Sequence, residues 1–279
     1  MRILITGVNG FVGKSLYKTL AEKNQVFGIY NSGIALFDNC IKIDLSNEEE
    51  ASIVIEKAGI EKIDSIVHLA SRTANASNLN DLSVLEANAS IAKNISFVAK
   101  KLEVKHFINL SSSSVYPNID GIYSEESIPN PSLNSDCIYG LSKLNSEVII
   151  NYFLSKSDIK ITHLRTTMIH GEGMDNTRII PIIEKEIAEN NSVTLFGMGE
   201  RLLNLISVEK LTEHISFFIK NPSNVVVNVG EECISLLDLA KRIIAEKGNS
   251  NTEIIFKEVG NRGKFILDIQ KLNKITANV

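Results

Sequence analysis

The chain has no tryptophan, and its 279 residues include only three cysteines and five prolines. Cys40, Cys137 and Cys233 are far apart and odd in number, which argues against a disulfide framework and fits free thiols in a reducing compartment. No apolar run approaches the length that a membrane span needs, and the first residues already resemble a strand rather than a charged leader. We therefore expect a cytoplasmic protein without a membrane partner.

The chain also has no strong excess of positive or negative charge, since the formal net charge is −4 and both signs are mixed along the sequence. A nucleic-acid partner is not expected, because such a partner calls for a basic surface. Five histidines are scattered without metal-ligand spacing, so we expect no metal site. With 44% hydrophobic residues the chain can bury a large core.

Glycines cluster directly after the first apolar run. Gly7, Gly10 and Gly13 follow a short strand pattern and precede a helical pattern that runs through about Ala21. Such a turn lets the backbone approach a ligand closely, and the helix N-terminus then offers unpaired N–H groups to a pyrophosphate. A nucleoside triphosphate loop is excluded, because that motif needs glycine where Val8 stands. A glycine turn without a ligand remains the alternative.

Apolar, often β-branched segments alternate with helical stretches over the first two thirds of the chain. This alternation is typical of a parallel sheet that is covered by helices on both faces. A polar, proline-bearing loop is expected at 117–136. Further along we expect helices at 177–189 and 235–246 and short strands at 192–196 and 203–207. The strands expected for the main sheet are Gln25–Tyr30, Cys40–Asp44, Asp64–Ala70, Val104–Leu110, Ile159–Leu164 and Asn224–Val229.

A tyrosine and a lysine four residues apart, Tyr139 and Lys143, would lie on one face of a helix. The lysine cation is expected to lower the pKa of the phenol from about 10 and make it a useful proton donor. A second copy of the spacing, Tyr152 with Lys156, is rotated by about 220° on the same helix. Only one copy can face a given cleft, and the serine cluster upstream favours Tyr139.

The glycine turn, the serine cluster and the Tyr139–Lys143 pair, taken in their order along the chain, resemble the extended short-chain dehydrogenase/reductases. This family includes nucleotide-sugar epimerases, dehydratases and reductases. The resemblance covers nearly the whole chain. It implies a Rossmann-type doubly wound α/β fold, with an NAD(P)-binding domain at 1–165 to which 204–230 return, and a small substrate-binding lobe at 166–203 and 231–279. The motifs that carry it are Gly7-x-x-Gly10-x-x-Gly13, Asp44-Leu45, His68-Leu69-Ala70, Asn88, the serines before Val115-Tyr116-Pro117, Tyr139-x-x-x-Lys143 and Leu164-Arg165 before Gly171.

The resemblance assigns roles by position. Ser112 would be the catalytic hydroxyl, Tyr139 the acid or base, and Lys143 the group that holds the nicotinamide ribose. Asp44 would accept a hydrogen bond from the adenine amine. For Asn88 a structural role is the alternative, in which its polar side chain forms hydrogen bonds with a loop. For His68 and His170 a structural role is favoured. The cofactor would be bound by Gly7, Asn9, Gly10, Phe11, Val12, Gly13, Asn31, Ser32, Asp44, Leu45, Leu69, Ala70, Ser71, Asn88, Tyr139 and Lys143.

Departures from the family pattern restrict the chemistry. Dehydratases place Asp-Glu where this chain has Ser113 and Ser114, and GDP-fucose synthases place a Cys and a His where it has Ser114 and Arg178. UDP-galactose 4-epimerases have Asn and Arg where it has Met168 and Leu203. The resemblance therefore implies simple reduction or oxidation at C4 of a nucleotide sugar, with 4-keto reduction ahead of 4-epimerisation. A non-catalytic NAD(P)-binding sensor is a further alternative.

Substrate and cofactor preferences follow from charge. Arginine suits a diphosphate because its fork donates two hydrogen bonds at once; we expect Arg178, Arg201 and Arg262 to serve, with Ser112 and Ser113 near the sugar, although each arginine could be a surface residue. The second strand ends in Asn31-Ser32 rather than an acid, which slightly favours NADP over NAD. No arginine lies there, and Lys14 is the nearest candidate cation. A homodimer through Val148, Ile149 and Tyr152 is expected by analogy.

Overall fold

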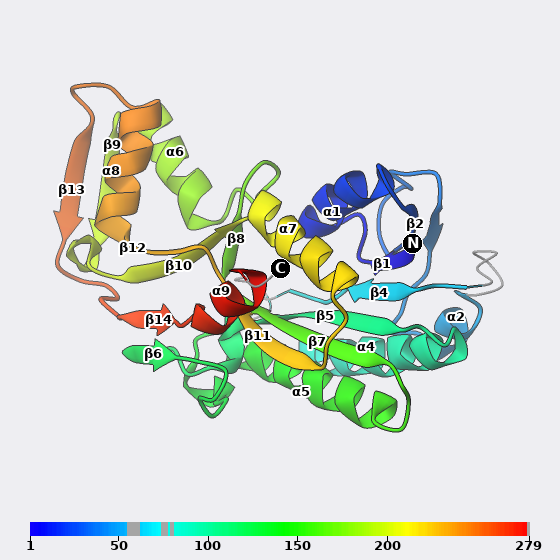
Figure 1. The fold of residues 1–279 in the computed structure, drawn as a ribbon. Helices are drawn as coiled ribbons and strands as arrows, with labels where there is room; N and C mark the ends of the chain where they lie inside the picture. The colour runs from blue at the N-terminus through cyan, green and yellow to red at the C-terminus, as the bar shows by residue number, and fades with distance from the viewer. Residues whose placement is uncertain (55–61, 74–77, 79–80, 278–279) are drawn as a thin grey trace.

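The fold is a seven-stranded parallel sheet with a small lobe beside it (Figure 1). It was determined as a computed structural model, which describes residues 1–54, 62–73, 78 and 81–277. The sheet order is β11-β7-β5-β4-β1-β2-β3, and every neighbouring pair is parallel. Its strands are β1 (Arg2–Thr6), β2 (Gln25–Tyr30), β3 (Cys40–Lys42), β4 (Ser65–His68), β5 (His106–Ser112), β7 (Lys160–Thr166) and β11 (Val225–Val229).

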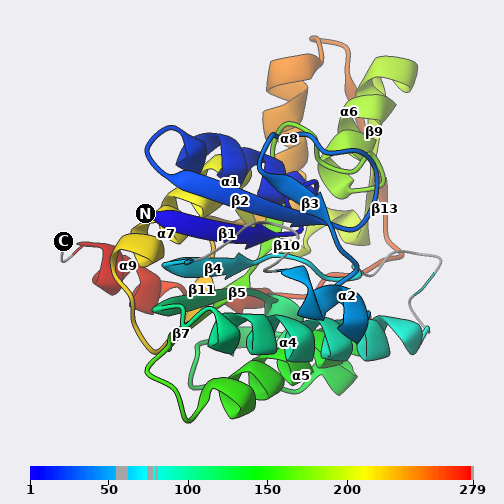
Figure 2. The same ribbon diagram turned by 90° about the vertical axis from the view of Figure 1, so that its right-hand side faces the viewer.

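Helices cover both faces of this sheet, as Figure 2 shows from the edge. Alternation along β1 explains the two layers: Ile3 and Ile5 belong to one apolar core and Leu4 to the other. The expected doubly wound α/β fold is therefore confirmed. The helices are α1 (Phe11–Ala21) and α7 (Val208–Lys220), with α9 (Gln270–Ala277) near them, and on the opposite face α2 (Glu48–Ser52), α4 (Ser83–Lys101) and α5 (Cys137–Leu154).

The order of the strands reverses between β1 and β4, because the chain winds outward from β1 to β3 on one side and from β4 to β11 on the other. At such a switch point, ligands bind beyond the carboxyl ends of the strands. The loops after β1 and β4 therefore meet where the glycine turn of residues 7–13 lies. The same edge receives the ends of β5 and β7.

A separate apolar core lies in the lobe, between α6 and α8 and the short strands beside them. The expected strands at 25–30 and 192–196 are found with those bounds, and the elements expected at 177–189, 203–207 and 235–246 shift by one or two residues. The lobe elements are β8 (Met168–His170), α6 (Ile179–Asn190), β9 (Ser192–Phe196), a 3-10 turn at Gly197–Gly199, β10 (Leu202–Ser207), β12 (Glu232–Ser235), α8 (Leu236–Lys247) and β13 (Glu253–Lys257).

Two differences from the sequence-based expectation affect the site. The main strands β5 and β7 run two residues further than expected, so that Ser112 and Thr166 stand at their ends as a registered pair. The segment expected as a plain loop contains β6 (Gly121–Tyr123) and a 3-10 turn at Pro131–Leu133, and β6 pairs in parallel with β14 (Phe265–Leu267) from near the C-terminus. Side-chain and backbone partners from distant segments impose this order, which local propensity does not encode.

Candidate active site

A cavity of about 770 Å³ lies at the carboxyl edge of the sheet, between the sheet and the lobe. Pockets of this size accommodate small molecules and cofactors. Most of the residues proposed for cofactor and substrate line it together: Gly7, Asn9, Gly10, Phe11, Val12, Gly13, Asn31, Ser32, Asp44, Leu45, Leu69, Ala70, Ser71, Ser112, Ser113, Tyr139, Lys143, Arg178 and Arg201. Asn88, Arg262 and Lys14 are not among the lining residues.

The glycine turn is packed so tightly that side chains do not fit. Gly7 has φ +72°, a left-handed conformation, and a Cβ there would lie 2.9 Å from the backbone nitrogen of Ala70. A Cβ on Gly13 would overlap the carbonyl oxygen of Gly7 and the backbone of Val8. Helix α1 can therefore begin directly against β1, with its free N–H groups at the cavity, as a bound pyrophosphate requires.

Asn9 connects this turn to the loop after β2. Its side-chain amide donates to the carbonyl oxygens of Ser32 (3.1 Å) and Ile34 (2.9 Å). The Oδ1 atom of Asn9 is buried and has no hydrogen-bond partner in the part of the chain that the structure describes. A buried polar atom without a partner is costly unless a ligand or water satisfies it, so the cavity suits a polar ligand at this point.

At the end of β3, Asp44 is held by its neighbour Ser46. The carboxylate Oδ1 accepts from the Ser46 backbone N–H (2.9 Å) and from its hydroxyl (2.6 Å). No hydrogen bond within the described residues involves the second oxygen, Oδ2, and the residue lines the cavity. Leu45 is buried, and its carbonyl accepts from Asn94.

The loop after β4 is fixed by Thr6. The hydroxyl of Thr6 accepts from the N–H groups of Leu69 and Ala70, both at 3.1 Å, so its own proton goes to Nδ1 of His68 at 2.7 Å. Burial, and then the Lys143 cation, lowers the pKa of His68 to about 3. A neutral, buried His68 agrees with the structural role favoured for it.

Asn88 lies behind the same loop and does not touch the cavity. Its Oδ1 accepts from the Arg72 N–H (2.7 Å), and its amide donates to the Arg72 carbonyl (3.0 Å) and to the Ser142 hydroxyl (2.9 Å). Asn88, expected to line the cofactor, is thus not among the residues that line the cavity. It joins the β4 loop to α5, which is the structural alternative for this residue.

Helix α5 brings Tyr139 and Lys143 to the cavity. At Gly140 a Cβ would overlap the carbonyl of Ser114, so the start of α5 lies directly against the turn that follows β5. The Lys143 Nζ lies 6.0 Å from the centroid of the Tyr139 ring. The competing Tyr152 is 75% exposed on the outer side of the helix, whereas Tyr139 and Lys143 line the cavity.

The expected effect of Lys143 on Tyr139 is wrong. Burial raises the pKa of Tyr139 to about 12; the Arg178 cation and a hydrogen bond with Ser71 lower it, and Asp136 raises it. Burial also lowers the pKa of Lys143 to about 8, against a raising effect of Glu147. Desolvation of both groups was not visible from their spacing. With the protein's own groups alone, Tyr139 keeps its proton near neutral pH.

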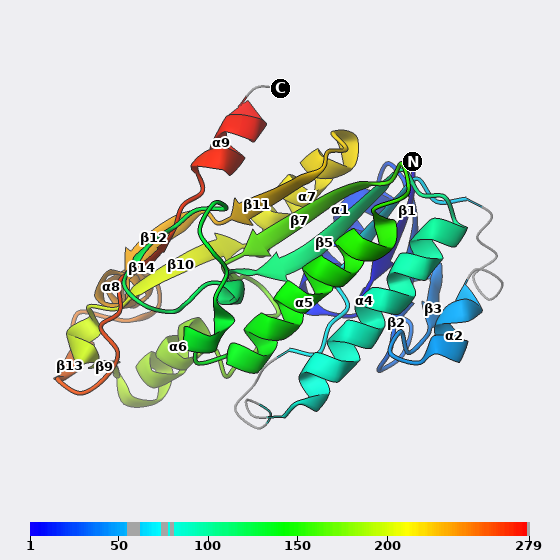
Figure 3. The same ribbon diagram turned by 90° about the horizontal axis from the view of Figure 1, so that it is seen from below.

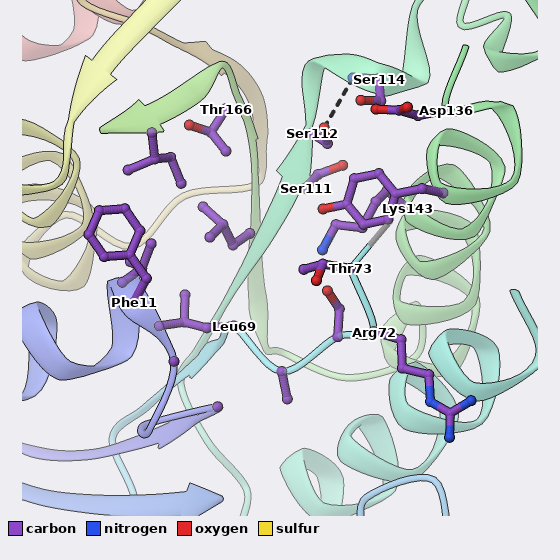
Figure 4. A pocket seen from close by; sticks show the side chains of 18 of the residues that line it. Phe11, Leu69, Arg72, Thr73, Ser111, Ser112, Ser114, Asp136, Lys143 and Thr166 are labelled. Carbon is purple, nitrogen blue, oxygen red and sulfur yellow. Dashed lines mark hydrogen bonds between the residues drawn. The ribbon is translucent and has the colours of Figure 1, made fainter. Parts of the chain in front are cut away.

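The serine cluster divides at the end of β5. The Ser112 hydroxyl accepts from the Ser114 N–H (3.1 Å) and caps the 3-10 turn Ser113–Val115, a contact drawn in Figure 4. Ser111 also lines the cavity (Figure 4), but its hydroxyl donates to Glu147 on α5 at 2.5 Å. Ser112, Tyr139 and Lys143 thus share one cavity.

The three arginines separate into two groups. Arg178 and Arg201 line the cavity, and Arg178 is close enough to Tyr139 to affect its pKa. Arg262 instead pairs with Glu200 (3.4 Å) and donates to the Glu258 carbonyl (3.2 Å) on the outside of the lobe. The expectation that Arg262 contacts substrate is not supported by its position.

Other lining residues were missed by sequence reasoning. Figure 4 shows Arg72 and Thr73 from the β4 loop and Thr166 from the end of β7 beside the proposed site. Their position after or at the end of a parallel strand was the available signal. Asn204 and Phe265 come from the lobe, and no motif in the sequence pointed to them.

Within the described residues, no group of three His, Cys, Asp or Glu side chains is arranged to hold a metal ion. None of the described helices is long and apolar enough to cross a membrane.

Comparisons with known proteins agree with this fold, which is that of the extended short-chain dehydrogenase/reductases. A model described as the NAD dependent epimerase/dehydratase family matches residues 3–230, and the chain belongs to that family.

Individual relatives are distant. A dTDP-D-glucose 4,6-dehydratase of Dictyostelium discoideum is 26% identical over 87% of this chain, and the match spans 61% of that protein's length. A GDP-L-colitose synthase of Yersinia pseudotuberculosis is 23% identical over 97% of this chain and 86% of its own. A UDP-glucose 4-epimerase structure from Thermotoga maritima, with UDP-glucose, has a TM-score of 0.85 at 21% identity, covering 98% of this chain and 92% of that one. The structural likeness supports the fold.

Proposed function

We propose that this protein is an NAD(P)-dependent oxidoreductase that acts at C4 of a nucleotide-activated sugar, with reduction of a 4-keto group as its preferred reaction. The observation that carries the proposal is that Ser112, Tyr139 and Lys143 face one cavity whose opposite wall is the glycine turn. A dinucleotide cradle and a protonated phenol on the same cavity are the two parts that carbonyl reduction needs.

The residues present fit a dinucleotide. The backbone at Gly7 and Gly13 leaves no room for side chains, the start of α1 offers free N–H groups, and Asp44 has an oxygen available for an adenine amine. When bound, the nicotinamide supplies or accepts a hydride at the sugar carbon. Lys143, a buried ammonium at the cavity wall, would hold the ribose hydroxyls.

Tyr139 suits the role of general acid. A pKa of about 12 keeps the phenol protonated near neutrality, and a protonated donor is what a carbonyl oxygen requires as negative charge develops on it. Ser112, whose hydroxyl faces the same cavity, would donate a hydrogen bond to that oxygen. As a base for oxidation, a phenol with this pKa would need further acidification by its surroundings.

Reduction is preferred because the side chains for the related reactions are absent. Ser113 and Ser114 line the cavity in the places where the dehydratases have an acid and a base, and neither serine can replace a carboxyl group in expelling water. Arg178 stands where the GDP-fucose synthases use a histidine for epimerisation next to the carbonyl. Met168 and Leu203, also at the cavity, replace polar residues of the UDP-galactose 4-epimerases.

The substrate would be held through its diphosphate. Arg178 and Arg201 line the cavity, and no hydrogen bond or ion pair of either side chain is found within the described residues. Unpaired guanidinium groups at a cavity wall fit a diphosphate.

For the cofactor, the family is NAD-dependent, while the absence of an acid at Asn31 and Ser32 removes a repulsion against the 2′-phosphate of NADP. Lys14, the cation considered for that phosphate, does not line the cavity. The preference for NADP therefore rests on Asn31 and Ser32 alone and is slight.

The test is incubation with a dTDP- or GDP-linked 4-keto-6-deoxyhexose and NADPH or NADH, with the nicotinamide absorbance followed over time. We expect net oxidation of NADPH or NADH, observed as a fall in the nicotinamide absorbance. Interconversion of 4-epimers without net oxidation would replace the proposal by the epimerase alternative. Cofactor binding without any turnover, together with an unchanged cellular role of Tyr139→Phe, would point to a non-catalytic sensor.

A homodimer through the outer face of α4 and α5 completes the proposal. Figure 3 shows the two helices side by side. Val148 and Tyr152 on α5 and Phe97 on α4 are exposed, whereas Ile149 packs against the core and does not belong to this face. Size-exclusion chromatography with light scattering should give twice the chain mass, and Tyr152→Glu should shift it to the monomer.

A further inference from the structure

A buried ion pair lies directly behind the proposed catalytic residues. Glu147 on α5 and Arg165 at the end of β7 are 4% and 6% exposed. Arg165 makes a two-pronged contact: its Nε donates to Glu147 Oε1 (3.0 Å), and its NH2 group donates to Oε2 (2.8 Å). Two such groups are costly to bury unless their geometry is fully satisfied.

Neighbouring side chains complete the network. Ser111 donates its hydroxyl to Glu147 Oε1 at 2.5 Å. The NH1 group of Arg165 donates to the Tyr116 hydroxyl (2.9 Å), which donates in turn to Asn228 Oδ1 (2.9 Å). Burial by itself would raise the pKa of Glu147, but the hydrogen bonds and charge of Arg165 outweigh it, so the pKa lies below its ordinary value. The carboxylate is therefore charged and held in one place.

Glu147 stands one helical turn after Lys143 on the same buried face of α5. No direct ion pair joins the two side chains within the described residues, because the carboxylate oxygens are directed to Arg165 and Ser111. The negative charge therefore acts on Lys143 through the protein interior, where screening by water is weak.

Other charged groups near Lys143 do not replace this effect. His68 from β4 is a neighbour whose positive form is disfavoured by Lys143 itself. Arg72, Arg178, Asp136 and Tyr139 line the same cavity. Glu147 is the group that raises the pKa of Lys143 against its burial, and α4 presents the uncharged Asn88 to this part of α5. On β7, His163 and Arg165 face Glu147.

We propose that Glu147, oriented by Arg165 and Ser111, is a positioning residue that keeps the buried Lys143 in its ammonium form, so that it can bind a nicotinamide ribose and serve Tyr139. This rests on the proposed function for what Lys143 does, but the charge of Lys143 is measurable without any substrate. It assigns a chemical role to an ion pair that could otherwise be regarded as structural.

The first experiment measures the ionisation of Lys143 in the apoprotein. Amine acylation at pH 6–10, followed by mass spectrometry of the Lys143 peptide, reports the fraction of free amine. In Glu147→Gln the titration should move to lower pH by about one unit or more, because a negative charge is removed and Arg165 is left uncompensated. Glu189→Gln, a surface carboxylate, should leave it unchanged. An unchanged titration in Glu147→Gln would overturn the proposal.

Because Glu147→Gln breaks a buried pair, it could fail to fold. The double variant Glu147→Leu/Arg165→Met replaces the pair by apolar side chains of similar volume, which proteins often tolerate. If the pair positions Lys143 as proposed, the double variant folds, and its Lys143 titration also moves down, by less than in Glu147→Gln. A folded double variant with the native titration would show that the pair serves packing only and would overturn the proposal.

A second readout separates this inference from the proposed function. Binding of NADH and NADPH, followed by nicotinamide fluorescence, should weaken about tenfold at pH 8 in Glu147→Gln and little at pH 6.5. If no sugar nucleotide is turned over but this shift is found, the proposed reaction fails and the role of Glu147 stands. If turnover is found and the decline of its pH–rate profile at alkaline pH is the same in Glu147→Gln as in the native protein, the role of Glu147 fails and the reaction stands.

Discussion

The two walls of the cavity are built in different ways. On the sheet side, backbone lies against backbone: Gly7, Gly13 and Gly140 each stand where a Cβ would collide with another segment. On the lobe side, the wall consists of long side chains such as Arg178 and Arg201 that have no hydrogen-bond partner within the described residues. The cofactor wall is therefore specified by close packing, and the substrate wall by side chains that can change without disturbing the fold.

The largest expected effect lies where the two walls meet. Tyr139→Phe removes the proposed proton donor and should lower kcat by about 10²–10⁴-fold, the usual worth of general acid catalysis, while cofactor affinity stays within a few-fold. The measurement is steady-state turnover beside nicotinamide fluorescence. Tyr152→Phe is the matched control and should behave as the native protein. Equal losses in both variants would contradict the assignment.

On the sheet wall, Gly13→Ala should be costly. The new Cβ would overlap the Gly7 carbonyl and force α1 away from β1, so we expect a loss of about 3 kcal/mol in the free energy of unfolding together with weakened cofactor binding. Urea unfolding provides the measurement. Lys18→Ala, on the exposed side of the same helix, should change stability by less than about 0.5 kcal/mol. A stable Gly13→Ala variant would mean that close packing does not define this wall.

On the lobe wall, Arg178→Ala and Arg201→Ala should leave stability unchanged and reduce kcat/KM about 10–100-fold, as expected for the loss of charge-assisted hydrogen bonds. The loss should appear in KM for Arg201, whereas Arg178 should also affect kcat because its cation acts on Tyr139. Arg262→Ala is the control, since Arg262 pairs with Glu200 outside the cavity. If Arg262→Ala lowered kcat/KM as much as the other two variants, the substrate would not be bound by Arg178 and Arg201 in the way proposed.

A last effect, visible only as a change of slope with pH, concerns the sheet alone, through its buried histidines. Burial lowers the pKa of His106 to about 4, below the ordinary 6.5, so the unfolded chain takes up the proton first as the pH falls. The stability contributed by the neutral ring is complete above about pH 6.5 and is lost toward pH 4, by up to about 1.4 kcal/mol per pH unit. His106→Gln should make the slope between pH 6.5 and 4.5 shallower by that amount in urea titrations. An unaltered slope would contradict this account.

Sequence reasoning succeeded where local pattern and backbone geometry coincide. The alternation of strands and helices along the chain predicted a parallel sheet covered on both faces. The spacing of Gly7, Gly10 and Gly13 predicted the turn that lines the cavity. It did not place Asn88, because a polar residue on a buried helix face can serve a ligand or a loop, and only the tertiary structure shows that Asn88 bonds the backbone of Arg72. It also did not place Arg262 outside the cavity, because its partner Glu200 lies 62 residues away in the chain.

By itself, the sequence determined which residues could form a dinucleotide turn and an acid–lysine pair, because these depend on neighbours within one turn of chain. Only the tertiary structure decided their ionisation. Burial raises the pKa of Tyr139 and lowers that of Lys143, while the Arg178 cation at the start of α6 and a hydrogen bond with Ser71 act against burial at Tyr139. The chemistry of the pair depends on this burial, since a charge is governed by the medium around it.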